Sequence, residues 1–412
     1  MSPTGEVRGE FIKVSVMRST LAVLTVFSLA SAARAFEREA PKSGFGALDH
    51  VFLIVMENQP DSKILGNPAL PFINAYAIKA NRAAEYFAVG HPSAPNYLEL
   101  VGGSNFGQTA DYWPDWIQGG CVDHDPASEL CKHALPPIGA PGVDNAVVAT
   151  AKDASQCNGD VAAAATPVPN NCALRDYPAA PFTPKSIADQ LVAKGLSWKT
   201  YQESLPTSEE GVAGVNYSDG FFSNLSSSAV FKAGPVQKLY SAKHNPFVYF
   251  RNIQLGADER LSLTRVAAFD GPSGLWADLQ SGAPSFSFIL PNQCHDMHGA
   301  PGGGAYCAYA TATAPNLLLP VGDRAVAKLV DGIKASPAWK RGRNALVIVW
   351  DENDYIGEVD AFANAANRVV LLVETNYAKN GAVSRAPYDH FSLLRTLEAG
   401  FGLPCLNHAC DS

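Results

Sequence analysis

Uninterrupted apolar runs along the chain predict the strands of a buried sheet. The clearest is HVFLIVM at residues 50–56, and similar runs occupy residues 286–290, 345–350 and 369–373. A strand covered on both faces needs no alternation of apolar and polar side chains, so such runs are typical of parallel sheets between helices. Residues 196–202 are expected to form a further strand.

Helical spacing of apolar residues separates these runs. Residues 324–335 have apolar side chains three and four positions apart, and helices are also expected at 183–195 and 391–400. Strands that alternate with helices predict an α/β fold, in which helices sandwich a mainly parallel sheet. The 412 residues are 47% hydrophobic and 17% charged, which allows a full core and argues against disorder over the whole chain.

One short helix is expected to begin at a serine. The stretch HPSAPNYLELVGG at residues 91–103 predicts a helix with Ser93 as its N-cap and two glycines at its end. Unpaired backbone N–H groups make the N-terminus of a helix electropositive, which suits a phosphate beside the Ser93 hydroxyl. The alternative is that Ser93 is an ordinary capping residue.

Ligand-type side chains follow the apolar runs where the expected strands end. Carboxylates, imidazoles and amide oxygens are the donors that divalent cations take in proteins, and carboxylates gathered at one sheet edge repel one another without a cation. We therefore expect a divalent metal ion, of unknown identity, at this edge. The alternative is a set of separate caps, solvated loop acids and surface ion pairs. The residues concerned are Glu57, Asn58, Asp351, Glu352, His295, Asp296, His298 and His390.

The first 35 residues resemble a secretory signal peptide in their pattern. Basic residues precede an apolar run at 21–30, and Ala33-Arg34-Ala35 fits the small-residue rule for cleavage. The run is too short to span a bilayer as a stable helix, although an uncleaved anchor is the alternative. We expect cleavage after Ala35, a secreted or periplasmic location, one domain over 36–412, and no stable membrane span in the mature chain.

Charge and cysteine content narrow the possibilities. The net charge is −8, and loss of residues 1–35 would make it about −10, which argues against general nucleic-acid binding. Eight cysteines lie after the cleavage site, an even number typical of disulfides in an oxidising compartment, with a zinc–thiolate site as the alternative. About residues 105–182 we expect a disulfide-stapled insertion over the sheet. The simplest pairing is Cys121–Cys131, Cys157–Cys172, Cys294–Cys307 and Cys405–Cys410.

Six motifs occur together in a fixed order. They are HVFLIVMEN, GHPSAPNYLELVGGS, HNPFVYF, PNQCHDMHG, VIVWDEND and PYDHFSLLRTLEAGFGLP, spread over residues 48–406. In this order they resemble the bacterial phosphoesterase family of secreted acid phosphatases and phospholipases C, which belongs to the alkaline phosphatase superfamily. The resemblance implies an alkaline-phosphatase-like fold and hydrolysis of phosphoric esters at a metal centre. The insertion at 105–182 has no counterpart in it.

The resemblance also implies roles for single residues. Ser93 matches the nucleophile. Relatives often have Asp-His where this chain has Asp351-Glu352, so the resemblance does not decide whether the chain holds a second metal ion. The matched metal ligands are Glu57, Asn58, Asp351 and Glu352; the substrate-binding residues are Asn96, His295, Asp296 and His390; His298 and His244 are the candidates for the acid that protonates the leaving group.

The implied reaction is hydrolysis of a phosphomonoester. A metal ion on the Ser93 oxygen lowers the pKa of the hydroxyl, in-line attack gives a phosphoserine, and water then hydrolyses it. The expected partner is a phosphorylated small molecule or a phospholipid head group, and no nucleic acid. One alternative is a phosphodiesterase of the phospholipase C type. Another is an envelope protein that binds phosphorylated ligands without turnover.

Overall fold

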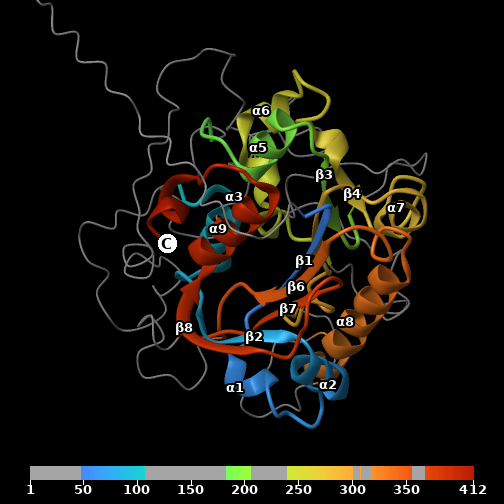
Figure 1. The fold of residues 1–412 in the computed structure, drawn as a ribbon, viewed down its shortest axis with the longest axis vertical. Coiled ribbons are helices and arrows are strands. Elements are labelled where there is room, and N and C mark those ends of the chain that lie inside the picture. Colours follow the sequence, from blue (N-terminus) through green and yellow to red (C-terminus); the bar gives the residue numbers. More distant parts are fainter. Residues whose placement is uncertain (1–47, 107–181, 206–238, 300–306, 308–316, 355–366) are drawn as a thin grey trace, which may run out of the picture. The chain divides into compact units, whose positions relative to one another are not determined.

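The apolar runs form the middle of one mixed sheet, which has eight strands in the described part of the chain (Figure 1). The computed structural model describes residues 48–106, 182–205, 239–299, 307, 317–354 and 367–412. The strands are β1 His50–Met56, β2 Asn81–Phe87, β3 Trp198–Gln202, β4 Val266–Ala268, β5 Phe286–Leu290, β6 Asn344–Trp350, β7 Leu371–Thr375 and β8 Val383–Asp389. They lie in the order β4-β3-β5-β1-β6-β7-β2-β8.

The sheet is mainly parallel, as predicted, with one exception. β7 runs antiparallel to both of its neighbours, β6 and β2, whereas every other named pair is parallel. The sequence predicted β7 at 369–373 and gave no sign of its direction. Its reversed direction places the end of β7 away from the edge at which the parallel strands end.

Strand β1 lies between β5 and β6 and is buried over Val51–Met56 because the sheet is covered on both faces. Its register pairs Ile54 with Ile289 of β5 and Met56 with Trp350 of β6. The residues that follow β1 and β6 therefore leave the sheet at the same level. This register determines where the polar side chains after each strand come together.

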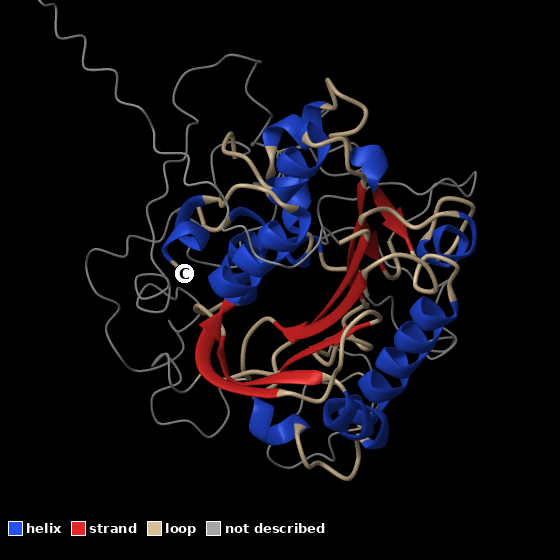
Figure 2. Cartoon of the chain, viewed as in Figure 1, coloured by secondary structure: helices blue, strands red, loops and turns tan. Residues whose placement is uncertain are grey.

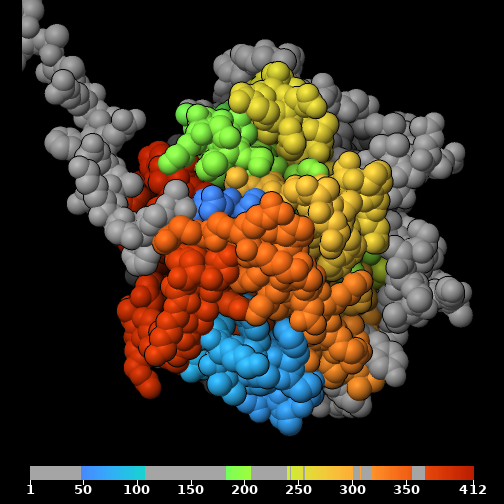
Figure 3. Space-filling model, turned by 45° about the vertical axis from the view of Figure 1, so that its right-hand side comes forward, coloured from blue at the N-terminus to red at the C-terminus, as the bar shows by residue number. Residues whose placement is uncertain are grey.

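Helices cover both faces of the sheet (Figure 2). α3, α5 and α9 lie together on one face, and α2, α7 and α8 lie on the other (Figure 1). Figure 3 shows the light-blue segment of α2 against the orange segment of α8. The helices are α1 Asp61–Ile64, α2 Pro71–Lys79, α3 Ser93–Gly102, α5 Ile187–Ala193, α6 Arg251–Leu255, α7 Leu275–Ser281, α8 Leu318–Ala335 and α9 His390–Phe401.

The predicted sandwich of helices and sheet is thus confirmed. Within the described residues, no helix combines the length and the apolar character that crossing a membrane requires. The expected signal peptide and its cleavage site lie outside the described residues, so the domain bounds and the location stay predictions.

Helix α3 begins one position differently from the prediction. Pro92, in an extended conformation, is the N-cap, and Ser93 is the first helical residue, so the prediction of Ser93 as the N-cap was wrong. Ser93 does not cap the helix because its hydroxyl lies against side chains that follow β1 and β6. The predicted end is confirmed, since Gly103 follows the helix with a left-handed φ of 70°.

The far end of α3 is held by residues near the C-terminus. Asn407 Nδ2 donates to the carbonyl oxygen of Gly102 at 2.7 Å, and the backbone N–H of His408 donates to that of Gly103 at 3.0 Å. A Cβ on Gly103 would lie 2.5 Å from the Leu406 carbonyl oxygen, so only glycine allows this approach.

Two of the four predicted disulfides are present. Cys294–Cys307 crosses the loop after β5, and Cys405–Cys410 closes the turn that contacts α3. The other two pairs lie outside the described residues, as does most of the expected insertion. Its described flanks meet, because the rings of Phe106 and Phe182 lie 5.2 Å apart between centroids.

Candidate active site

Three segments meet at the edge where the parallel strands end. Glu57 follows β1, Asp351 follows β6, and Asp296 lies in the loop after β5. Backbone hydrogen bonds join them, because Asp351 N donates to the Met56 oxygen at 2.9 Å and Glu57 N donates to the Asp296 oxygen at 2.8 Å. All three carboxylates are fully buried. The structure therefore brings together side chains that are far apart in sequence.

The Ser93 hydroxyl lies among acceptor oxygens. Its Oγ is 2.8 Å from Glu352 Oε1, 3.3 Å from Glu57 Oε2 and 3.3 Å from Asn58 Oδ1. A hydroxyl has one proton to donate, and the shortest contact gives it to Glu352. The serine is 1% exposed, so these oxygens and not bulk water surround its Oγ.

The Asn58 side chain tests whether a cation fits here. One of its two amide atoms, oxygen or nitrogen depending on the orientation of the amide, lies 3.0 Å from Glu57 Oε2 and 3.1 Å from Glu352 Oε1. In one orientation the amide NH₂ donates to both carboxylates; in the other its oxygen faces both, and only a cation makes that contact favourable. In this second orientation the donor set is all oxygen, the kind that hard divalent cations take.

Burial and mutual repulsion act on the carboxylates in the same direction. Burial raises the pKa of Glu57 well above its ordinary value, and the charges of Asp351 and Asp296 raise it further. Burial likewise raises the pKa of Asp351, with the neighbouring Glu352 charge adding to it. Burial is also the main cause that raises the pKa of Asp296. Neutralisation by a cation or by protons is therefore required for this cluster.

Two buried histidines face Glu57. His244 Nδ1 lies 3.3 Å from Glu57 Oε1, and the His244 and His298 rings stand edge-on with centroids 5.3 Å apart. Ligand atoms of these three residues all lie within 4.8 Å of one another, so the group could hold a metal ion. His298 Nδ1 donates to the Gly299 carbonyl at 2.6 Å, so Nε2 is the nitrogen that can gain or lose a proton. Burial lowers the pKa of His244 well below its usual value and keeps it neutral.

Some buried polar atoms of the site make no hydrogen bond. Asp296 Oδ2 and both ring nitrogens of His244 lack a hydrogen bond to any described residue, although Nδ1 lies 3.3 Å from Glu57 Oε1. Buried polar atoms cost free energy unless something pairs with them, and such orphans mark places for an ion or ligand. The residues present thus fit a divalent cation, with Glu57 common to the oxygen group and the histidine group.

Two residues of the site were not predicted. His91 Nδ1 bonds to Glu352 Oε2, and the Tyr97 hydroxyl donates to Glu57 Oε1. The Tyr97 ring also stacks on His244, with 5.3 Å between centroids and 18° between planes. They stand two residues before and four residues after Ser93, so one helical turn places Tyr97 on the serine's side of α3. That spacing was the available sequence signal.

Asn96, predicted to bind substrate, has its side-chain amide engaged within the protein. Its Oδ1 accepts from the backbone N–H groups of Val89 at 3.0 Å and Gly90 at 3.1 Å. Its Nδ2 donates to the carbonyl oxygens of Gly90 at 2.8 Å and Pro92 at 3.2 Å. Both amide protons are thus used within the protein, and the side chain fixes the turn that leads into Ser93.

His390 and His295 also lie apart from the Ser93 hydroxyl. His390 Nε2 donates to the Asp351 carbonyl at 2.7 Å, and its Nδ1 accepts from the Tyr86 hydroxyl at 2.8 Å, so both nitrogens are engaged behind Asp351. Burial lowers the pKa of His390 to about 4. His295 Nδ1 bonds to Glu203 Oε2 at 2.7 Å and lines a separate cavity. Their predicted contact with substrate finds no support in these positions.

A buried serine at the start of a helix, beside carboxylates and imidazoles that fit a cation, is compatible with hydrolysis of phosphoric esters. The chain belongs to the phosphoesterase family, whose model matches residues 63–404.

The chain is similar to known proteins over most of its length. It is 24% identical over 364 residues to a phosphatidylinositol-3-phosphatase of Mycobacterium tuberculosis, covering 88% of this chain and 80% of that protein. It is 21% identical over 322 residues to a phosphate-repressible acid phosphatase of Penicillium chrysogenum, covering 78% of this chain and 52% of that protein. Among solved structures, a Vibrio parahaemolyticus protein of the alkaline phosphatase superfamily aligns with 12% identity and a TM-score of 0.44, covering 89% of this chain and 70% of the other.

Proposed function

We propose that the chain is a secreted, metal-dependent acid phosphatase that hydrolyses phosphomonoesters through a phosphoserine on Ser93. The observation that carries the proposal is the contact of Ser93 Oγ with the side-chain oxygens of Glu57, Asn58 and Glu352. An acid phosphatase and a phosphoinositide phosphatase among the relatives support the choice of monoesters.

The metal ion would be held by Glu57, Asn58, Asp351 and Glu352, with His244 beside Glu57 as a further ligand. When bound, it supplies positive charge that lowers the pKa of the Ser93 hydroxyl and neutralises the phosphoryl oxygens.

The chain's own groups then account for the transfer of protons and of the phosphoryl group. Glu352 Oε1 accepts the Ser93 proton, the bond from Oγ to phosphorus forms, and the bond from phosphorus to the leaving oxygen breaks. The leaving oxygen takes a proton from His298 Nε2, and the backbone N–H groups at the start of α3 bind phosphoryl oxygens. In the second half, neutral His298 accepts a proton from the attacking water, and Ser93 recovers its proton as phosphate leaves.

Secretion is part of the proposal. The Cys294–Cys307 and Cys405–Cys410 disulfides support maturation in an oxidising compartment. Amino-terminal sequencing of the protein recovered from periplasm or medium tests it. A mature chain that begins at Phe36 is the expected result, and a chain retained in the cytoplasm with residues 1–35 attached contradicts it.

The central test compares wild type, Ser93→Ala and the exposed control Ser281→Ala on p-nitrophenyl phosphate and bis-p-nitrophenyl phosphate at mildly acidic pH. We expect faster turnover of the monoester, a loss of at least about a thousandfold in Ser93→Ala, and wild-type rates in Ser281→Ala. Acid quenching during turnover should leave a phosphoryl group on the peptide that contains Ser93.

Each contrary result selects another function. Faster turnover of the diester indicates a phosphodiesterase. Unchanged activity in Ser93→Ala removes the serine from the mechanism. Binding of phosphate esters by wild type without turnover, with every divalent cation tried, indicates a binding protein.

A further inference from the structure

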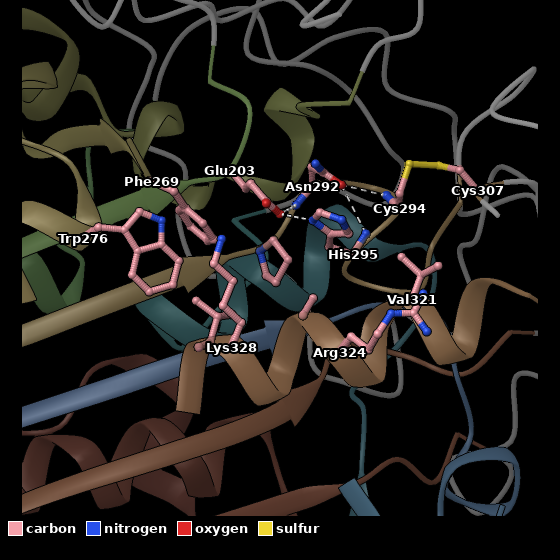
Figure 4. A pocket seen from close by; sticks show the side chains of 13 residues that line it. Glu203, Phe269, Trp276, Asn292, Cys294, His295, Cys307, Val321, Arg324 and Lys328 are labelled. Atoms are coloured by element: carbon pink, nitrogen blue, oxygen red, sulfur yellow. Dashed lines mark hydrogen bonds and ion pairs between the residues drawn. A yellow bond between two sulfur atoms is a disulfide. The ribbon is translucent and has the colours of Figure 1, made fainter. Parts of the chain in front are cut away.

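A second cavity lies beside the reaction centre and belongs to none of the steps above. It has a volume of about 600 Å³ and is formed by the ends of β3, β4 and β5 together with one side of α8 (Figure 4). Neither Ser93 nor any of the proposed metal ligands lines it. Its size is typical of sites for small organic molecules.

Two cations of α8 line the cavity. Arg324 and Lys328 are four positions apart and therefore share one side of the helix, and Figure 4 shows them across the cavity from Asn292 and His295. Among the described residues no carboxylate forms an ion pair with either of them. The nearby Asp323 is engaged elsewhere, since its carboxylate accepts from the backbone of α2. Like charges at this spacing repel, so the pair is favourable only with an anion or in water.

The one acid among the residues that line the cavity is already hydrogen-bonded. Glu203 Oε2 accepts from His295 Nδ1 at 2.7 Å and from the backbone N–H of Asn292 at 3.0 Å. The two cations of α8 outnumber this single carboxylate and make the cavity positive. A positive recess on a chain of net charge −8 is a local feature, because the chain as a whole is acidic.

Aromatic rings line the cavity next to Lys328. Phe269 and Trp276 stand edge to face with 6.0 Å between centroids, and Lys328 Nζ lies 4.9 Å from the Trp276 ring centroid. Such a wall binds an apolar or ring-bearing body next to the charged group. The preferred occupant thus combines an anionic group with an apolar part.

The loop after β5 separates this cavity from the reaction centre. His295 lines the cavity. Asp296 and His298, which follow it in the same loop, lie at the reaction centre. We propose that the cavity is a second, non-catalytic site that binds an organic phosphate, with the phosphate on Arg324 and Lys328 and the apolar part on Phe269 and Trp276. This inference does not depend on the proposed function.

The test is calorimetric titration of the full-length, metal-loaded protein with benzylphosphonate, a non-hydrolysable organic phosphate mimic. We expect two binding events in wild type and one in the Arg324→Ala/Lys328→Ala double variant. Removal of both cationic contacts should weaken the missing event at least about tenfold. The matched control is Lys340→Ala/Arg341→Ala, which removes two exposed charges that follow the same helix and should keep both events.

Two further probes separate charge from ring. Methylphosphonate has the charge without the ring and should bind the cavity several-fold more weakly, and benzyl alcohol has the ring without the charge and should not bind. The cavity event should also weaken as salt rises, because both cations are exposed.

The inference is overturned if the Arg324→Ala/Lys328→Ala variant keeps both events at wild-type affinity, or if wild type shows one event that disappears with chelation. Equal binding of benzyl alcohol would also overturn it. Failure of the proposed function, measured as absence of turnover or loss of the event at the Ser93 site, would leave the cavity event in place.

Discussion

Charges of opposite sign gather on the two sides of the loop after β5. Around Ser93 the carboxylates of Glu57, Asp351 and Glu352 are fully buried, whereas Arg324 and Lys328 stand exposed at the rim of the neighbouring cavity. This difference shows that burial determines whether a charge needs a counter-charge within the folded structure. A buried cluster needs its counter-charge as part of the folded structure, whereas an exposed pair can exchange water for a ligand.

Magnitudes support this contrast. Two unit charges about 4 Å apart interact by roughly 4 kcal/mol at an effective dielectric constant of 20, and by about 1 kcal/mol in water. Repulsion at the reaction centre is therefore a substantial fraction of the stability of a domain, whereas repulsion in the cavity is small. Loss of the counter-charge should damage the first region and leave the second folded.

The largest effect is expected from metal removal. Exhaustive chelation should reduce turnover to below about 1% and lower the midpoint of thermal unfolding, because the buried carboxylates lose their counter-charge. Activity and elemental analysis before and after readdition of divalent cations measure this. Full activity in protein that contains no metal would contradict both the mechanism and the contrast between the regions.

Glu57→Gln tests the same contrast through one charge. With metal bound, we expect turnover to fall at least about a hundredfold, because Glu57 contacts Ser93, Tyr97 and the His244 side of the site. In chelated protein the substitution should instead raise the unfolding midpoint at neutral pH, because it removes a buried charge. Thermal unfolding midpoints of Glu57→Gln with and without metal measure this effect. The exposed Asp331→Asn control should not show it.

The middle of the fold could be predicted because its strands are apolar throughout. HVFLIVM and the runs that became β5 and β6 have no solvent-facing side, so composition alone identified them. β2, NRAAEYF, and the exposed β8, VSRAPYD, were missed because polar residues interrupt the apolar pattern in strands near an edge of the sheet. α8 begins at Leu318, earlier than predicted, because residues 318–323 lack the spacing that marked the rest.

The site could be predicted only in part. Polar residues directly after a buried strand are visible in sequence, as Glu57 and Asp351 show. Whether a side chain faces inward or holds the backbone depends on packing, which separates His298 at the reaction centre from His295 in the cavity. For the same reason, the sequence does not show that Asn96 supports the backbone of its own turn.

Asn96→Ala should have an intermediate effect on the reaction centre. Loss of its four hydrogen bonds should lower the free energy of unfolding by about 2–4 kcal/mol and reduce kcat about tenfold, because the turn before Ser93 loosens. Asn74→Ala is the matched control. Its side chain, on α2, makes a similar set of backbone hydrogen bonds, none of them to the turn before Ser93.

Denaturant unfolding and steady-state kinetics compare the two variants. Asn74→Ala should lose stability while kcat is retained. If Asn96→Ala likewise loses stability alone, Asn96 does not position the nucleophile.

The smallest expected effect is on the pH dependence of stability, and it comes from a buried acid outside both regions. Burial raises the pKa of Glu398 on α9 to about 8, against an ordinary value of 4.5. Between these values the unfolded state releases the proton first, so stability falls as pH rises from about 4.5 to about 8. Glu398→Gln should flatten this fall by about 2–4 °C in the unfolding midpoint.

Thermal unfolding across this pH range measures the change, with the exposed Glu259→Gln as the control. A wild-type profile in Glu398→Gln would show that burial of this acid alone does not produce a pH-dependent cost. The effect of the reaction centre on stability would then come from repulsion among its charges and not from their burial.

The contact between residues 405–410 and the last turn of α3 has a consequence for local unfolding. Local opening of this segment would release the Gly102 and Gly103 carbonyls. Amide exchange in the last turn of α3 should then follow opening of residues 405–410 more closely than opening of the sheet. The stiffness of the nucleophile's helix is thus set from a part of the chain about three hundred residues away from it.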